Sequence, residues 1–295
     1  MLYAMNAVTW KIIIKGSGDC PLSFLKLLKV TISGFALNYA TPCGLMGGEP
    51  YKILELTPHI GRDRATSSVL LFAMTHIFAH FWYWLTAVVL YVCLVPMDSQ
   101  MYIIMSLMGA FCVGGIYLFT RGYKKGIVKK CLGWVAHIPG LKKVIGNFIL
   151  NHEEELVKID SQIAHLHNQE RGSFYKSFFL EYLGRLCHSF EIFFMLQLTS
   201  VEGSFLQLFF YSLLILAFTS LFANLLFFMP LQLGGREGGF AMSCVQVIGG
   251  IVGHNEAMTI AFFVSIVCRV REIIWTVIGL GLMKIGVKKN RLDEC

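Results

Sequence analysis

The sequence contains few charged residues and few prolines. Of its 295 residues only 15% are charged and 7 are proline, whereas 56% are hydrophobic and the mean hydropathy is +0.63. Because soluble domains carry roughly 25% charged residues, this composition excludes a soluble protein. We expect an all-α, polytopic integral membrane protein, with residues 1–295 forming one membrane domain of about seven passes at roughly 20 apolar residues each.

Motifs for metals, cofactors and nucleic acids are also missing. The nine cysteines include no CxxC pair, and His76 and His80 lie four residues apart without an evident third metal ligand. The formal charge of +7 comes from short basic tracts beside apolar segments, which membrane topology explains without a nucleic-acid partner. We therefore expect no cofactor, no metal site and no catalytic residue, and we do not expect an enzyme.

Long apolar segments occupy most of the chain. Four could cross a membrane as helices, at 67–95, 101–120, 176–201 and 204–229. A fifth, at 257–285, carries charges in its middle, and two more, at 22–56 and 230–253, are interrupted by proline and glycine. Residues 2–14 are apolar but too short to span, and they lack the basic front of a signal peptide, so we expect part of a first helix to be lost.

Lysine and arginine predict the orientation in the membrane, since short cytoplasmic loops are enriched in them. Basic residues mark the linker 121–175, which separates the halves 1–120 and 176–295, and they mark the C-terminal tail. We expect both to be cytoplasmic in a multi-pass protein of the cell (inner) membrane. In this map the broken segment 22–56 begins and ends inside, whereas 204–253 begins and ends outside, so the two have opposite polarity.

The two interrupted segments share a pattern. In each, a proline at the end of an apolar run is followed by a glycine pair and then by a carboxylate seven residues after the proline. The matching residues are Pro42, Gly47, Gly48 and Glu49 in the first segment and Pro230, Gly234, Gly235 and Glu237 in the second. Broken hydrophobic segments in corresponding places are typical of inverted-repeat transporters. We predict a helix bundle with two inverted, re-entrant helical hairpins.

Three stretches carry a resemblance to a known family. They are Pro42, Gly44, Gly47, Gly48, Glu49 and Pro50; Pro230, Gly234, Gly235 and Glu237; and SIVCRVREIIWTVIGL at 265–280. From about residue 22 to residue 283 the chain resembles the lysylphosphatidylglycerol synthase transmembrane family, a flippase-like membrane domain. Thr75 and His76 stand where members often carry an acidic residue and an arginine.

The resemblance implies an activity on lipids. Bifunctional relatives add a cytosolic aminoacyl transferase domain, whereas this sequence stops at Cys295, so synthase activity is not expected. The implied function is that of a lipid flippase or transporter for an anionic, aminoacylated or polyprenyl-linked lipid. The alternative is a membrane enzyme or accessory protein acting on lipid-linked intermediates in envelope biogenesis. The lipid itself, the energy coupling and the oligomeric state stay open.

Ionisable residues within apolar segments are the candidates for binding substrate, because they are costly in a membrane and are functional by default. The candidates are Glu49, Arg185, Arg236, Glu237, Arg269 and Glu272. Three of these, Glu49, Arg236 and Glu237, adjoin irregular backbone, which survives at membrane depth only when it is buried or lines a polar cavity. The alternative is that both motifs lie at the membrane interface and only shape turns.

Helical spacing groups the other candidates. Glu181, Arg185 and His188 share one helix face, as either a substrate lining or a structural ion pair. Arg269 and Glu272 form an i, i+3 pair, in which Arg269 is either a phosphate partner or the partner of Glu272. We expect five of the charged residues to converge on one central cavity that opens sideways to the bilayer; they are Glu49, Arg185, Arg236, Glu237 and Arg269.

Overall fold

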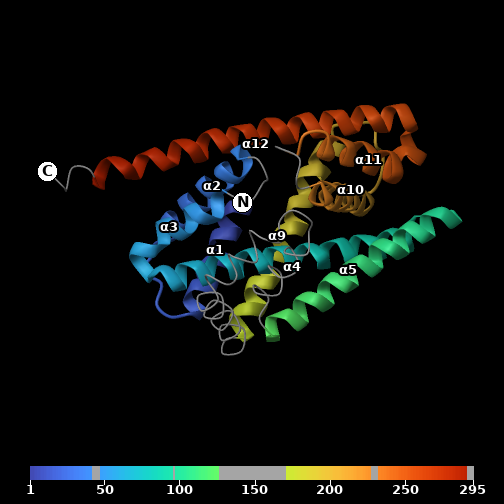
Figure 1. Ribbon diagram of the computed structural model, residues 1–295. Helices are drawn as coiled ribbons and strands as arrows, with labels where there is room; N and C mark the ends of the chain where they lie inside the picture. The colour runs from blue at the N-terminus through green and yellow to red at the C-terminus, as the bar shows by residue number, and fades with distance from the viewer. Residues whose placement is uncertain (42–46, 96, 126–170, 227–231, 291–295) are drawn as a thin grey trace, which may run out of the picture.

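The computed structural model describes residues 1–41, 47–95, 97–125, 171–226 and 232–290 (Figure 1). Within them lie nine helices and no strand, which confirms the all-α class. The helices are α1 (Leu2–Gly16), α2 (Phe24–Ala40), α3 (Gly48–Ile60), α4 (Arg62–Leu94), α5 (Ser99–Lys125), α9 (Arg171–Leu196), α10 (Phe205–Leu225), α11 (Gly235–Val252) and α12 (His254–Asn290).

Three of these helices, α4, α5 and α10, are long and apolar enough to cross a membrane. They correspond to the predicted segments 67–95, 101–120 and 204–229. The predicted segments 176–201 and 257–285 correspond to α9 and α12, which have 26 and 37 residues and carry charged residues along their length. The apolar helices, together with the charged ones beside them, are those of a multi-pass membrane protein.

A break between two helices occurs in the segment 22–56, and another occurs in the segment 204–253. In the first, α2 ends at Ala40 and α3 begins at Gly48. In the second, α10 ends at Leu225 and α11 begins at Gly235. Gly234 has a φ of 80°, a conformation open to glycine at little steric cost, and this explains the glycine that precedes α11. Three motif residues lie outside the described residues; they are Pro42, Gly44 and Pro230.

Helices α1–α4 and α9–α12 form two sets whose neighbours correspond. In both sets the first helix packs against the second, the second against the third and the third against the fourth. The sets also interlock, because α2 packs against α12 in the other set while α10 packs against α4. The first helices of the two sets, α1 and α9, pack against each other, and α5 packs against α4 (Figure 1).

Two apolar clusters form the core. One gathers residues of α1, α2, α3 and the first half of α4, and includes Trp10 and Phe72. The other gathers the second half of α4 with α5, α10, α11, the end of α9 and the first part of α12, and includes Tyr91 and Phe240. Helices α4 and α9 pass through both clusters. On α9 the residues Glu181 to Glu191 lie between the buried members of the two clusters, and His76, on α4, lies two residues before Phe78 of the first cluster.

A close contact between α2 and α12 joins the two sets. A Cβ atom at Gly279 would lie 2.6 Å from the Cβ of Ala36 and 2.7 Å from the carbonyl oxygen of Ile32. Across the same contact Ser33 Oγ donates a hydrogen bond to the Gly279 carbonyl oxygen at 3.0 Å. By contrast, a Cβ at Gly281, one half-turn further along α12, would meet nothing within 4 Å.

These two glycines provide a matched pair of variants. Gly279→Ala should destabilise the protein by about 1–3 kcal/mol, because the clash is partly with backbone and the helices must separate. Gly281→Ala should leave stability unchanged or raise it by up to about 1 kcal/mol, through helix propensity alone. The midpoint of thermal unfolding in detergent measures both effects. Equal midpoints for the two variants would contradict the α2–α12 contact.

Candidate functional site: a charged cavity between the two helix sets

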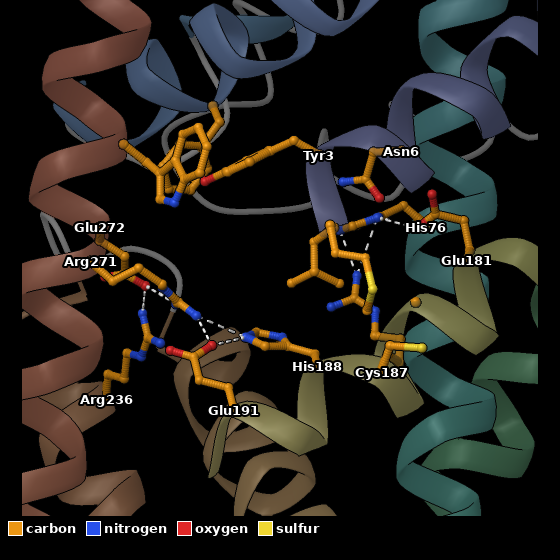
Figure 2. Close-up of a pocket in the computed structure, with 16 residues that line it drawn as sticks. Tyr3, Asn6, His76, Glu181, Cys187, His188, Glu191, Arg236, Arg271 and Glu272 are labelled. Carbon is orange, nitrogen blue, oxygen red and sulfur yellow. Dashed lines mark hydrogen bonds and ion pairs between the residues drawn. The ribbon is translucent and has the colours of Figure 1, made fainter. Parts of the chain in front are cut away.

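A cavity of about 460 Å³ lies where the two helix sets meet. Its walls come from α1, α2, α4, α9, α11 and α12 (Figure 2). The polar and charged side chains in the walls are Tyr3, Asn6, His76, Glu181, Arg185, Cys187, His188, Glu191, Arg236, Arg271 and Glu272. Three arginines face three glutamates there, so the lining contains many charges of both signs but carries little net charge.

Helix α9 supplies the largest share of this lining. Glu181, Arg185 and His188 all line the cavity, together with Glu191 one turn further on. Helical geometry explains the alignment, since residues three and four apart lie on the same face. An inward position is expected because a charged side chain exposed to lipid at the bilayer centre costs roughly 2.5–3.5 kcal/mol on insertion scales. The shared face predicted from the spacing is therefore present.

On one side of the cavity, His76 bridges Glu181 and Arg185. The ring atom Nδ1 of His76 is 2.7 Å from Oε2 of Glu181. Nη2 of Arg185 is 2.6 Å from Nε2 of His76 and 3.2 Å from Nδ1. Arginine can only donate, and Nδ1 is the ring nitrogen beside the carboxylate, so we assign the ring proton to Nδ1, which donates to Glu181, and leave Nε2 unprotonated next to the guanidinium. This hydrogen-bond pattern assigns a neutral imidazole to His76.

On the other side, Arg236 and Arg271 contact carboxylates directly. Arg236 pairs with Glu272, and Arg271 pairs with Glu191. A further ion pair joins Arg271 to Glu272 at 3.4 Å, and His188 Nε2 lies 3.1 Å from Glu191. Figure 2 shows this group on α9, α11 and α12, opposite the group around His76. Glu272 is the link between the two arginines, and its side chain is only 7% exposed.

Two predicted site residues, Arg269 and Glu237, lie beside this group and not in the cavity wall. Nε of Arg269 donates to Glu237 at 2.7 Å, and its Nη atoms donate to Tyr39 at 3.2 Å and to the carbonyl oxygen of Gln232 at 3.1 Å. Arg269 is also 3.7 Å from Glu272. The guanidinium therefore ties the start of α11 and the preceding break to α2 and α12, which favours the ion-pair alternative for Arg269.

Glu49 lies at the other helix break and does not line the cavity. It accepts hydrogen bonds from Asn38 at 2.9 Å and from Lys52 at 3.1 Å, while the Gly48 N–H donates to Asn38 at 2.8 Å. These contacts hold the start of α3 against α2. The predicted convergence is thus correct for Arg185 and Arg236, and Glu237 and Arg269 adjoin the cavity through Glu272. It does not hold for Glu49, whose charge is compensated locally by Lys52.

The glycines and the proline of the first break have local roles. A Cβ at Gly48 would lie 2.2 Å from the Gly34 carbonyl oxygen, so glycine permits the close crossing of α2 and α3. Gly47 immediately precedes α3. Pro50 occupies the first turn of α3, where its missing N–H removes no intrahelical hydrogen bond. In the second break, Gly235 begins α11, and Glu237 caps that helix by accepting from the Gly234 N–H at 2.8 Å.

Several lining residues were not predicted from the sequence. Tyr3 and Asn6 were missed because the segment containing them was judged too short to span a membrane. Arg271 was missed because the i, i+3 rule paired Glu272 with Arg269 and left Arg271 on another face. Its signal in the sequence was indirect: Glu191, on α9, has no basic partner other than His188 nearby on its own helix. Among the described residues, no group of three metal-ligating side chains occurs.

The fold and the cavity together define an α-helical membrane protein with charged groups enclosed between its helices. The chain belongs to the lysylphosphatidylglycerol synthase transmembrane region family, whose profile matches residues 1–268 of the 295. The match confirms the family to which the sequence motifs pointed. No curated protein and no solved structure matches the chain.

Proposed function

We propose that this protein is a flippase that moves an anionic, aminoacylated or polyprenyl-linked lipid across the cytoplasmic membrane. The observation that supports it most is the cavity, which places three arginines, three glutamates and two histidines among helices that include the long α4, α9 and α12. At about 460 Å³ the cavity falls in the range of small-ligand sites and suits a polar headgroup, while acyl chains would stay in the bilayer. In this proposal the lipid is carried and not chemically converted.

We assign different roles to the charged residues. Arg185, Arg236 and Glu272 line the cavity and would contact the headgroup, the arginines through charge-assisted hydrogen bonds to phosphate. Arg269 and Glu237 would position Glu272 and the α10–α11 break. Glu49 would hold the α2–α3 break. This division follows from which side chains line the cavity and which do not.

The interrupted segments are proposed to be inverted, re-entrant hairpins. Supporting this, α2–α3 and α10–α11 are both helix–break–helix units, and the two helix sets have corresponding neighbours. The reciprocal contacts of α2 with α12 and of α10 with α4 are those that a pseudo-two-fold axis would produce. Both breaks are tied by glutamates, through Lys52 and through Arg269, as breaks within a membrane would require.

Site-directed labelling tests the proposed topology. With all nine cysteines replaced by alanine, a cysteine at Lys142 in the linker should react with a membrane-impermeant maleimide only after the cells are opened. A cysteine at Gln100, at the start of α5, should react in intact cells. The reason is the concentration of basic residues in the linker and their absence near Gln100. Labelling of Lys142→Cys in intact cells would contradict the inverted arrangement.

A translocation assay tests the function. In vesicles with headgroup-labelled lipids, the wild-type protein should exchange phosphate-bearing lipids between leaflets faster than empty vesicles do. Arg185→Gln should slow this exchange about tenfold or more, because a hydrogen bond to a charged group contributes roughly 1.5–3 kcal/mol. Arg64→Gln is the matched control, since Arg64 contacts Ser17 and the Asp19 carbonyl oxygen, away from the cavity.

The outcomes of this assay distinguish the flippase activity from the role of the cavity in it. Wild-type protein that exchanges none of the phosphate-bearing lipids above background would refute the flippase proposal. If Arg185→Gln and Arg64→Gln exchange lipid equally fast, the flippase activity is supported but the cavity is not its route. An uncharged diacylglycerol analogue serves as the lipid control, and its exchange should not depend on Arg185.

A further inference from the structure

Arg185 differs from the other two arginines of the cavity. Arg236 and Arg271 each contact a carboxylate directly, whereas the Arg185 guanidinium contacts the His76 ring. Within the described residues, no acceptor lies within hydrogen-bonding distance of its remaining N–H groups. Because a neutral imidazole compensates no charge, Arg185 is the cavity arginine best able to take an incoming anion.

His76 holds Arg185 only while the ring is neutral. In the neutral form Nε2 carries no proton and lies 2.6 Å from Nη2 of Arg185, while Nδ1–H donates to Glu181. If a proton bound to Nε2, the ring would have two donors and no acceptor, and a cation would face the guanidinium. The contact between His76 and Arg185 would then break, whereas the bond to Glu181 would strengthen. Protonation of His76 is therefore coupled to the release of Arg185.

The surroundings of His76 allow its ring to be protonated. Its side chain is 37% exposed toward the cavity, so a proton can reach the ring, while the Glu181 side chain is 2% exposed. The Oε1 atom of Glu181 is buried without a hydrogen-bond partner, and so is Nδ1 of His80, whose ring centre lies 5.3 Å from that of His76. A second proton acceptor and a free carboxylate oxygen thus adjoin the bridge.

The charged groups around His76 come from few elements. Helix α9 contributes Glu181, Arg185 and, beside His80, His188, while α3 contributes Lys52, which is paired with Glu49. Helix α10 has no charged residue, and α1 presents Asn6 to the cavity and carries its lysines further along. The charged residues of α5 lie in its last turns. No second carboxylate among these groups is available to neutralise Arg185.

We propose that the cavity takes up a proton on His76 together with a phosphodiester headgroup on Arg185. The phosphate oxygens draw the guanidinium away from Nε2 of His76, and Nε2 then binds one proton taken up from the bulk solvent. The products are an imidazolium bonded to Glu181 and an arginine–phosphate pair, so one proton enters and no covalent bond of the lipid changes. This rests on the headgroup site of the proposed function and adds proton linkage to it.

Linkage between proton uptake and lipid binding makes the affinity for the phosphodiester depend on pH. If binding takes up one proton, affinity for the phosphodiester must rise as the pH falls, by up to about tenfold per pH unit. By reciprocity, the bound phosphodiester must favour the protonated form of His76. A flippase with this linkage would move a proton with each anionic headgroup, which would make the net charge of the cargo smaller during crossing.

Titration calorimetry of the full chain in detergent tests the proposal. The probe is dihexanoylphosphatidylglycerol, whose phosphodiester does not itself titrate near neutral pH. Repeating the titration in buffers of different ionisation enthalpy gives the number of protons taken up per lipid bound. Wild type should take up close to one proton, and His76→Gln, which keeps a donor and an acceptor but cannot titrate, should take up none. His59→Gln is the control, because His59 contacts Lys26 outside the cavity and should behave as wild type.

Every other outcome refutes one part of the proposal. Binding without proton uptake, or uptake that persists in His76→Gln, refutes the proton linkage and leaves the flippase proposal standing. Uptake lost in His80→Gln but kept in His76→Gln places the proton on the wrong residue and refutes the bridge. No binding to wild type refutes the headgroup site itself. Thermal unfolding of each variant, compared with wild type, shows whether a loss reflects misfolding.

Discussion

Charged side chains on α9, α11 and α12 must find their partners inside the protein, because lipid offers them none. At roughly 2.5–3.5 kcal/mol for each charge exposed at the bilayer centre, three arginines and three glutamates would together exceed the net stability of an ordinary domain. The remedy is to place every one of them at the contact between the two helix sets. The contact of α2 with α12 lies next to this charged group, through the bond of Arg269 to Tyr39, whereas α10 packs against α4 through apolar side chains.

The same arrangement creates a polar space in an apolar protein. Apolar clusters fill both ends of the bundle, so the charges in between cannot be covered by packing and instead face one another across the cavity. On the outside, α5 exposes large apolar side chains such as Leu107 and Phe111, as a helix in contact with lipid should. A polar interior with an apolar exterior matches the two chemical parts of a phospholipid, and for this reason we propose a lipid headgroup as the occupant.

Sequence reasoning found the features that depend on local spacing. Helix breaks at the glycine pairs and the stripe of Glu181, Arg185 and His188 both follow from short-range rules, and both are present. Features that depend on partners far away in the sequence were not predictable in this way. Arg271, on α12, pairs with Glu191, on α9, and the burial of α1 between α2 and α9 makes a short helix part of the lining. Neither fact follows from the pattern within one segment.

The central claim is that a lipid headgroup enters the charged space between the two helix sets. Photo-crosslinking measures this most directly, with a phospholipid that carries a diazirine on its headgroup and peptide mapping of the adducts after illumination. The account predicts adducts on α1, α4 and α9 at the cavity, and it predicts that excess unlabelled phosphatidylglycerol will compete with them. Adducts confined to α5 and to the helix ends, with none in the cavity-lining peptides, would contradict it.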